Sequence, residues 1–354
     1  MSSEEYLADV ATRHQVFIQR YGTGVAEKYV NDLERINERV ATRLKNQEID
    51  KATRGKLRQI QLDINQLLGD GYNQANTSLL LEYENFAEVE ADFSASMINE
   101  ATTARYTANL PTLEQMQSAL SVSSFSPDGG RTLVNIEQAL TRFTSKKAEL
   151  VRQTVRDGIV LGDTSAVISE RIQDLTRVTK AQANTLARTM TNHVSQIARE
   201  ELIRRNDDVI DEVIWTATLD NRTSLICASR DQTRYPVNSN FPRPPAHYNC
   251  RSTLNFKVNP EFDLAGKAVG DRPSKGATGK KDIKANINYG QWLKKQPASF
   301  QDAYFAKFTD GDIKAKLFRK GKLPLDRFID NDGAQYSLQE LRQYNPIVFA
   351  KAGV

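Results

Sequence analysis

The chain has 354 residues, of which 39% are hydrophobic and 26% are charged, and its formal net charge at pH 7 is +4. This length suffices for two or three folding units. No stretch approaches the roughly 18 uncharged apolar residues that a membrane span requires. The amino terminus has early acidic residues and lacks the apolar region of a secretory signal. We therefore expect a protein that is made and assembled in a cytoplasm and has no membrane partner.

The first hundred residues have the spacing of amphipathic helices. Apolar residues at intervals of three, four or seven predict a helix over residues 4–48, and similar stripes predict helices over 50–68 and 73–104. The glycine-rich segment 69–71 is expected to separate the second helix from the third. Residues 1–120 are therefore predicted to form a helical bundle or an elongated assembly arm, whose apolar stripes are buried against a partner or a second copy.

A second helical region follows a break at residues 121–132, which are rich in Ser, Gly and Pro. Helices are predicted from 136 to about 155 and from 179 to about 205. Between them, Gly158 and Gly162 are expected to bracket a turn, and Thr164-Ser165 can cap the helix that follows it. Beyond them, β-branched and aromatic residues predict a strand over 209–220, which could pair with a second strand over 251–258.

The predicted fold class is α+β, predominantly α-helical. We expect four parts: the helical arm at 1–120, a central helical domain with a small β-sheet at 133–258, a basic linker at 259–288 and a helical module at 289–354. The linker is inferred from its Gly, Pro and Lys content.

Positive charge is concentrated late in the chain. Between Lys257 and Lys322 there are 15 Lys or Arg residues against 7 Asp or Glu residues. Such a block predicts salt-dependent contact with the phosphates of DNA, without recognition of base sequence. The alternative is a solvated surface that is rich in lysine. Under the first hypothesis, the DNA-binding residues are Lys275, Lys280, Lys281, Lys284, Lys294 and Lys295.

Both cysteines and one of the three histidines lie in one stretch. Cys227, His247 and Cys250 are candidate ligands of Zn²⁺, with Asp220 or water completing a tetrahedron. Alternatively, the site is structural without metal, and the cysteines are buried apolar groups or form a disulfide outside a reducing cytoplasm. Two further alternatives are His247 as a lone general base and Cys227–His247 as a thiol nucleophile pair.

The helix predicted before the strand has polar residues that suit a buried hydrogen-bonded cluster. His193 is expected to join Arg188 and Asn192 in such a cluster. Arg188 could also pair with Asp220 across the helix and the strand. Pairs of this kind hold a domain together and are weak evidence of catalysis.

The order of the motifs resembles the domain of phage Mu protein F-like head-morphogenesis proteins. The resemblance spans roughly residues 140–258, and many relatives have Cys where this chain has Ser224. The matching positions are Ala187-Arg188-Thr189, Asn192, Trp215, Asp220, Arg222, Thr223, Cys227, Pro245, His247, Cys250 and Arg251. Among them, Arg188, Asn192, Trp215, Asp220, Arg222 and Arg251 are expected to be structural.

The carboxyl-terminal part is similar to a module found in many phage minor head proteins. The similarity is carried by segments 289–297, 317–321 and 326–330, with Gly311 and Lys314 in place of the more usual Gly-x-x-Arg. Locally, the aromatic residues of these segments are expected to form a small core.

These resemblances imply a structural minor head protein of a tailed phage and not an enzyme. They imply a location in the virion, inside the capsid near the portal. The portal protein and the major capsid protein are the implied partners, together with packaged DNA, and we expect several copies or a homo-oligomer. Ejection with the genome is a further expectation. The alternatives are a domain-associated enzyme or toxin that uses the Cys/His site, and a prophage-derived effector with no virion role.

Overall fold

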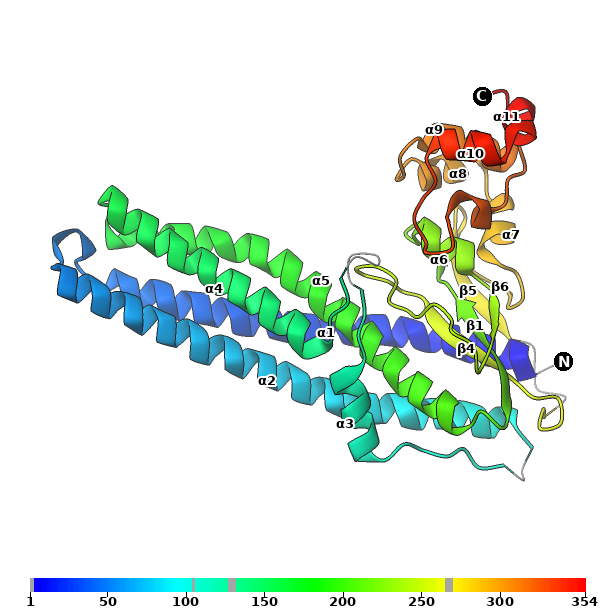
Figure 1. The fold of residues 1–354 in the computed structure, drawn as a ribbon, viewed down its shortest axis with the longest axis horizontal. Coiled ribbons are helices and arrows are strands. Elements are labelled where there is room, and N and C mark those ends of the chain that lie inside the picture. Colours follow the sequence, from blue (N-terminus) through cyan, green and yellow to red (C-terminus); the bar gives the residue numbers. More distant parts are fainter. Residues whose placement is uncertain (1–2, 104–105, 127–131, 265–269) are drawn as a thin grey trace.

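The computed structural model describes residues 3–103, 106–126, 132–264 and 270–354 (Figure 1). The fold is α+β and mostly helical, which confirms the predicted class. Long helices form an elongated bundle, and two small sheets lie beside the bundle near its amino-terminal end. Short carboxyl-terminal helices project from the sheets, away from the bundle. In the described ranges, no helix has the length and apolar character needed to cross a membrane.

Two helices, α1 (Ser3–Lys45) and α2 (Arg54–Ala101), form the amino-terminal half of the bundle, joined by the short 3-10 helix Ile49–Lys51. The predicted break at 69–71 is wrong, because α2 continues through it. A Cβ atom on Gly71 would lie only 2.8 Å from Cγ1 of Ile36 on α1. Close packing of the two helices therefore requires glycine here and outweighs its weak helix propensity.

The bundle is completed by α4 (Ile136–Leu161) and α5 (Ser165–Arg205), with the short α3 (Leu113–Val122) beside them. Gly162 ends α4 in the left-handed conformation, with φ of 73°. Thr164 then caps α5 by accepting a hydrogen bond from the backbone N–H of Val167. The predicted cap at Thr164-Ser165 is thereby confirmed. The helix that it starts and the helix predicted from residue 179 are one continuous helix, which ends near residue 205 as predicted.

The apolar stripes of α1 and α2 are buried within the chain itself. Tyr29 and Leu33 of α1, Leu79 of α2, and Leu140 and Ala187 of α4 and α5 belong to one core cluster. The prediction that a partner or a second copy covers these stripes is therefore wrong. The division at residues 1–120 and 133–258 stays a prediction, although both ranges contribute to this one core.

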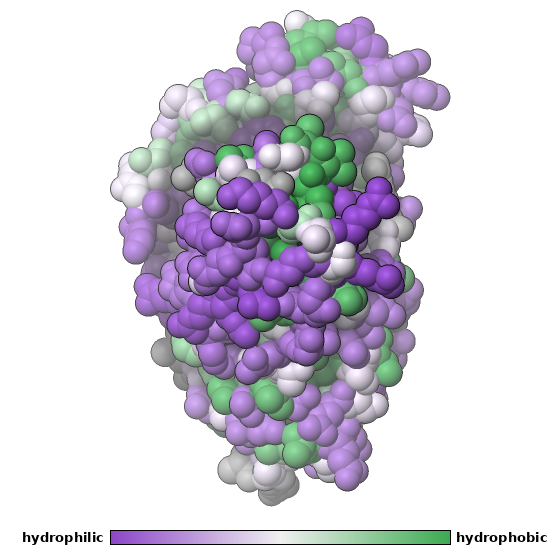
Figure 2. Space-filling model, turned by 90° about the vertical axis from the view of Figure 1, so that its left-hand side faces the viewer, coloured by the Kyte–Doolittle hydropathy of each residue, from purple (hydrophilic) through white to green (hydrophobic). Residues whose placement is uncertain are grey.

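The far end of the bundle, where α4 ends and α5 begins, is largely hydrophilic. Figure 2 views the molecule from this side and shows small apolar groups separated by polar side chains. Val160 and Leu161, in the last turn of α4, are 81% and 68% exposed. Small exposed apolar groups such as this pair are common on protein surfaces.

The first sheet contains β1 (Ile210–Thr216) between β3 (Arg234–Pro236) and β4 (Thr253–Val258), all antiparallel. Trp215 of β1 lies opposite Leu254 of β4. The predicted pairing of the strands at 209–220 and 251–258 is therefore confirmed.

The second sheet lies mostly in the predicted linker. It contains β2 (Leu219–Asp220), parallel to β5 (Asp271–Gly276), and β6 (Gly279–Lys284), antiparallel to β5. The prediction of a structureless linker at 259–288 is wrong for this hairpin; residues 265–269 lie outside the described part. Ala277 and Thr278 connect the two strands. Gly279, which follows them, has φ of 98°, a conformation that glycine adopts without strain.

The carboxyl-terminal region is a small helical module with its own aromatic core, as predicted. Its helices are α7 (Tyr289–Lys294), α8 (Ala298–Phe305), α9 (Gly311–Arg319), the 3-10 helix Leu325–Phe328, α10 (Leu338–Tyr344) and α11 (Pro346–Ala352). The same core includes Leu225 and Ala228 of α6 (Leu225–Arg230). Through α6, the module packs against the central region.

Candidate metal centre

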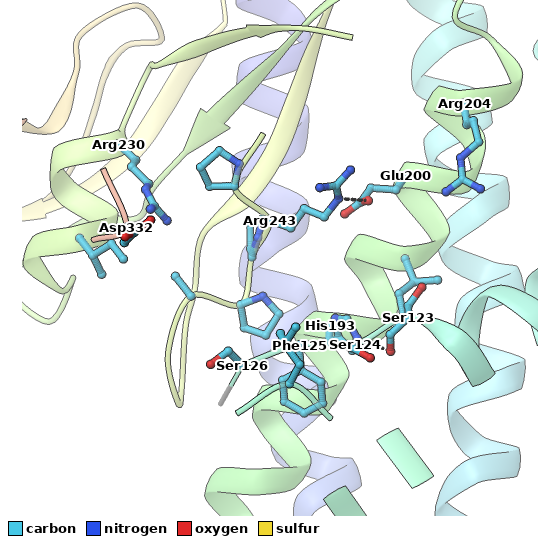
Figure 3. Close-up of a pocket in the computed structure, with 17 residues that line it drawn as sticks. Ser123, Ser124, Phe125, Ser126, His193, Glu200, Arg204, Arg230, Arg243 and Asp332 are labelled. Atoms are coloured by element: carbon cyan, nitrogen blue, oxygen red, sulfur yellow. Dashed lines mark hydrogen bonds and ion pairs between the residues drawn. The ribbon is translucent and has the colours of Figure 1, made fainter. Parts of the chain in front are cut away.

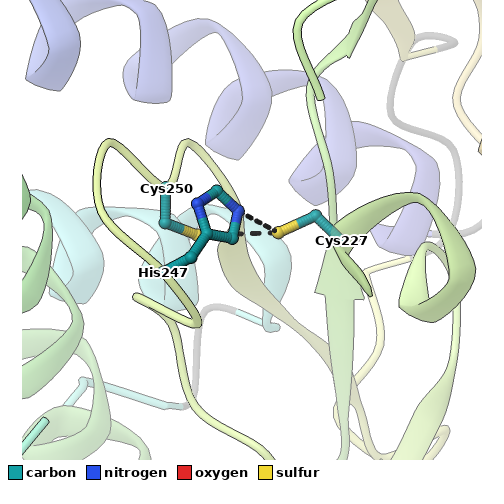
Figure 4. Close-up of side chains that lie close together, drawn as sticks. All are labelled: Cys227, His247 and Cys250. Atoms are coloured by element: carbon teal, nitrogen blue, oxygen red, sulfur yellow. Dashed lines mark hydrogen bonds between the residues drawn. The ribbon is translucent and has the colours of Figure 1, made fainter. Parts of the chain in front are cut away.

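Cys227 is held in the first turn of α6, whose start is fixed by Ser224. The hydroxyl oxygen of Ser224 accepts a hydrogen bond from the backbone N–H of Cys227, at 3.3 Å. His247 and Cys250 come from the loop before β4, where the N–H of Cys250 donates to the carbonyl of His247 at 3.1 Å. This tight turn brings both side chains to the same side of the loop, facing α6 (Figure 4).

The three side chains form the group that we name the Cys–His site: Cys227, His247 and Cys250. Sγ of Cys227 lies 3.2 Å from Nε2 of His247 and 3.7 Å from Sγ of Cys250. All three ligand atoms lie within 4.8 Å of one another. A tetrahedral zinc ion with bonds of about 2.3 Å to sulfur and 2.0 Å to nitrogen separates its ligand atoms by roughly 3.5–3.8 Å. The separation of the two Sγ atoms falls in this range, and the separation of Cys227 Sγ from His247 Nε2 lies just below it. The three residues that the sequence singled out therefore meet closely enough to hold zinc.

The imidazole of His247 is oriented as a metal ligand requires. Its Nδ1 lies 2.8 Å from the backbone carbonyl oxygen of Tyr248. A carbonyl can only accept, so Nδ1 carries the proton, and the lone pair of Nε2 faces Cys227. Metal-binding histidines usually donate their other N–H to a carbonyl or a carboxylate in this way.

The two thiols are almost fully buried, with exposed fractions of 2% for Cys227 and 3% for Cys250. The hydrogen bond from Cys250 lowers the pKa of Cys227 to about 7. Burial raises the pKa of Cys250 well above its ordinary value. Cys227 is therefore the thiol of the pair that loses its proton more easily. Loss of the second proton requires a neighbouring positive charge, which a metal ion would supply.

Ser224 lies beside the Cys–His site, where Asp220 or water was expected as the fourth ligand. Its hydroxyl oxygen lies 2.7 Å from Nε2 of His247. Asp220 is instead engaged by Arg251, whose Nη1 and Nη2 lie 2.5 and 2.7 Å from its two carboxylate oxygens. Ser224 was missed as a functional residue. The signal was its place directly after Arg222-Thr223 and three residues before Cys227.

The Asp220–Arg251 pair anchors the loop that follows Cys250. Although burial opposes it, Arg251 holds the pKa of Asp220 below its ordinary value. Arg222 donates its backbone N–H to the same carboxylate at 2.9 Å. Arg188 does not pair with Asp220 in the described structure, so that expectation is wrong. Burial, and then the charges of Arg222 and Arg251, lower the pKa of Arg188.

Two other motif residues connect α5 to the loop of the site. Asn192 accepts a hydrogen bond from Gln15 of α1 at 2.8 Å and donates to the carbonyl of Ser252 at 3.3 Å. Thr189 accepts the backbone N–H of Asn249 at 2.9 Å. These bonds join α1, α5 and the Cys250 loop, and the structural role expected for Asn192 agrees with them.

Trp215 lies in the core on which the Cys–His site rests. Its side chain is fully buried, and it belongs to the same apolar cluster as Cys227 and Cys250. The guanidinium of Arg230 lies 5.4 Å from its ring centroid. Trp215 therefore contributes packing behind the site, in line with the structural role expected for it.

The six lysines assigned to DNA contact do not form one surface. Lys275 and Lys280 lie opposite each other on the β5–β6 hairpin and share a face. Together with Arg222 and Arg251, they line a cavity of about 490 Å³ against α1.

The remaining four lysines lie elsewhere. Lys281 alternates to the other face of the hairpin, and Lys284 lies on the face of Lys280 but opposite Asp271. Lys294 and Lys295 are at the end of α7, and Nζ of Lys294 lies 5.6 Å from the ring centroid of Phe318.

His193 faces away from the predicted polar cluster. It borders a separate cavity of about 490 Å³ between α5, the segment after α3 and the proline-rich loop (Figure 3). Its Nε2 lies 3.4 Å from the carbonyl oxygen of Ser123, and its ring packs against Phe125. The predicted cluster of His193 with Arg188 and Asn192 is wrong, because neighbouring helix positions point about 100° apart.

The buried His193 predicts a loss of stability in mild acid. Burial lowers its pKa to about 4, from 6.5 in an unfolded chain. The stabilisation from the neutral ring is complete above pH 6.5 and is lost as the pH falls towards 4. Between pH 7 and 4.5, His193→Gln should lose about 2 kcal/mol less unfolding free energy than the unmodified chain. Urea denaturation at both pH values measures this difference, and equal losses would contradict it.

Residues 149–255 match the family model described as Phage Mu protein F like protein. This range contains all of α5, the first sheet up to Asn255 and all three residues of the Cys–His site. No curated protein and no solved structure was found to match the chain. The family resemblance inferred from the motifs is thereby confirmed for this range.

Proposed function

Because the chain contains a phage Mu protein F-like domain over residues 149–255, we propose that it is a structural minor head protein of a tailed phage. In this proposal it takes part in head morphogenesis and stays in the virion, inside the capsid near the portal. Its partners are the portal protein and the major capsid protein, and several copies are present in each particle. The family match is the observation that carries this function.

The geometry of the Cys–His site and of the Asp220–Arg251 pair supports a structural role for the domain. The thiols of the Cys–His site are 2% and 3% exposed, which leaves little room for a substrate to reach them. The site joins α6 to the loop before β4, and the Asp220–Arg251 pair fixes the residues on either side. Such side-chain contacts between segments far apart in the sequence stabilise a small sheet that has few strands of its own.

Removal of the gene from the phage that carries it tests this function. We expect lysates without the protein to contain few infectious particles, and expression of the unmodified chain in the host to restore the yield. A Cys250→Ser chain, in which the Cys–His site is broken, should restore it poorly. Normal yields of infectious particles without the protein would reject a role in head morphogenesis.

Contact with packaged DNA is a second part of the proposal, supported by Lys275 and Lys280 on one hairpin face beside Arg222 and Arg251. Binding of a 30-base-pair duplex, measured by fluorescence anisotropy, should weaken steeply with NaCl. Each phosphate contact contributes about −0.9 to the slope of log K against log salt. The Lys275→Gln/Lys280→Gln variant should therefore make the slope shallower by about 2.

The matched control for this experiment is Arg156→Gln, which also removes positive charge but lies near the far end of α4. It should leave the slope unchanged. Duplex affinity that does not depend on ionic strength would reject backbone contact altogether.

One observation favours an enzyme as the second candidate, namely the 2.7 Å approach of Ser224 Oγ to His247 Nε2. A hydroxyl beside an imidazole is the arrangement of a hydrolytic nucleophile and its base. Here the hydroxyl also caps α6, and the imidazole is oriented by a backbone carbonyl in place of a carboxylate. Hydrolysis that disappears in Ser224→Ala, with the fold and the particle yield retained, would establish the enzyme.

A further inference from the structure

A cationic cavity lies between α4 and α5, and Tyr248 of the Cys250 loop also lines it. Its volume is about 650 Å³, within the range of roughly 300–1,000 Å³ that is typical of small-molecule sites. Arg142, Lys146 and Lys147 of α4 line it, together with Gln182 of α5 and Tyr248.

Lys147 is buried at this cavity without an acidic partner. Its exposed fraction is 6%, and its Nζ donates a hydrogen bond to the side-chain oxygen of Gln182. Among the described residues, no carboxylate lies within ion-pair distance of Nζ. Burial, followed by the charge of Lys146, lowers the pKa of Lys147. Proteins normally pair a buried charge, so an unpaired ammonium at a cavity wall points to an anionic ligand.

The other residues that line the cavity also favour an anionic ligand. Arg142 and Lys146 add two exposed cations, and none of the described lining residues is Asp or Glu. The apolar part of the wall includes Phe143, whose ring centroid lies 5.4 Å from Nζ of Lys147. Tyr248, at the other side, is 45% exposed. Nucleobases stack on aromatic side chains, and phosphates bind Lys and Arg. Cations beside aromatic rings at a cavity wall therefore suit a ligand that has both a phosphate and a nucleobase.

We propose that this cavity binds a nucleoside phosphate, with its phosphate on Lys147, Arg142 and Lys146 and its base against Phe143 and Tyr248. The same chemistry is offered by a free nucleotide and by an unpaired nucleotide of a DNA strand. This assignment is independent of the proposed head function, because it concerns a ligand of the isolated chain.

Isothermal titration calorimetry on the full-length protein tests the assignment, with dAMP, sodium phosphate, a 5′-phosphorylated ten-nucleotide oligo-dT and a ten-base-pair duplex as probes. We expect saturable binding of dAMP that is tighter than binding of phosphate. Lys147→Met should weaken it at least about tenfold, since hydrogen bonds to charged groups are strong. Arg156→Gln, on the same helix and outside the cavity, is the control and should not change it.

The probes separate the two sources of the ligand. Binding of dAMP without the oligonucleotide assigns a free nucleotide, and comparable or tighter binding of the oligonucleotide assigns an unpaired strand. Absence of binding by both, or binding that Lys147→Met leaves unchanged, would overturn the proposal. If Lys147→Met does not fold, Arg142→Gln/Lys146→Gln replaces it, because both side chains are exposed.

Melting temperature provides a second readout that needs no ligand. If Lys147 is retained for binding, then Lys147→Met should raise the melting temperature, because it removes an unpaired buried charge and keeps a side chain of similar length. A lower melting temperature would show that Lys147 supports the fold, and would contradict its assignment as a ligand-binding residue.

Discussion

Replacing Asp231 with asparagine should lower the free energy of unfolding by about 3–5 kcal/mol, because it breaks a buried ion pair and leaves the partner charge uncompensated. The side chains of Asp231 and Arg272 are both fully buried. Nη2 of Arg272 lies 3.0 and 3.1 Å from the two carboxylate oxygens. Water cannot reach the unpaired guanidinium of Arg272 at this position unless the core opens.

Asp231 also accepts two backbone hydrogen bonds that join separate parts of the molecule. The N–H of Ala217, between β1 and β2, lies 2.7 Å from one carboxylate oxygen. The N–H of Tyr289, at the start of α7, lies 2.6 Å from the other. An asparagine would present an amide group to at least one of these donors. The expected destabilisation therefore includes the interface between the central domain and the carboxyl-terminal module.

Urea denaturation followed by tryptophan fluorescence measures this effect, because Trp215 and Trp292 lie in the two cores concerned. The matched control is Asp302→Asn, which removes the same charge from a side chain that is 54% exposed and pairs with Arg319 at the surface. Surface pairs contribute about 0–1 kcal/mol. A loss in Asp231→Asn no larger than in the control would contradict the account of this pair.

Zinc binding at the Cys–His site should produce the second large effect. Purified protein should contain about one zinc ion per chain, and removal of the metal with a chelator should lower the melting temperature. A ligand present at a thousand times its dissociation constant stabilises the folded state by about 4 kcal/mol. Cys250→Ser should abolish the zinc content and match the chelated protein in stability.

Ser337→Ala is the control for the metal experiment. It removes the cap of α10, which costs about 1 kcal/mol, and leaves the Cys–His site untouched. Its zinc content should therefore stay near that of the unmodified chain. A metal role for the site would be contradicted if the unmodified chain binds no zinc and has the same stability as Cys250→Ser in reducing buffer.

Helices were predictable where the apolar spacing alone decides the structure. The stripes of α1, α4 and α5 are long and regular, and their predicted extents agree with the structure to within a few residues at most of their ends. The continuity of α2 was not predictable, because it depends on the contact of Gly71 with Ile36 on another helix. A glycine needed for close packing and a glycine that ends a helix look the same in a single sequence.

The β5–β6 hairpin was missed for a similar reason. Its strands contain Gly, Pro and several lysines, all of which disfavour strands by local propensity. What holds it in place is non-local: Arg272 is buried against Asp231, and β2 supplies a parallel neighbour. Propensity could not reveal either contact.

At the candidate site, the sequence identified the residues better than it identified their pairing. Cys227, His247 and Cys250 were predicted to meet, and their side chains do so. Asp220 was expected beside the metal or paired with Arg188, yet it pairs with Arg251. The path of the loop decides whether Arg188 or Arg251 reaches the carboxylate of Asp220. The spacing of the motifs does not reveal that path. The Asp231–Arg272 pair lay outside every recognised motif.

Quantitative mass spectrometry of purified, nuclease-treated particles tests the structural role most directly, since it compares the amount of this chain with that of the major capsid protein. We predict that the chain is present in every particle at a few copies, and that it remains after washing in high salt. Particles that are infectious and contain none of it would contradict the account.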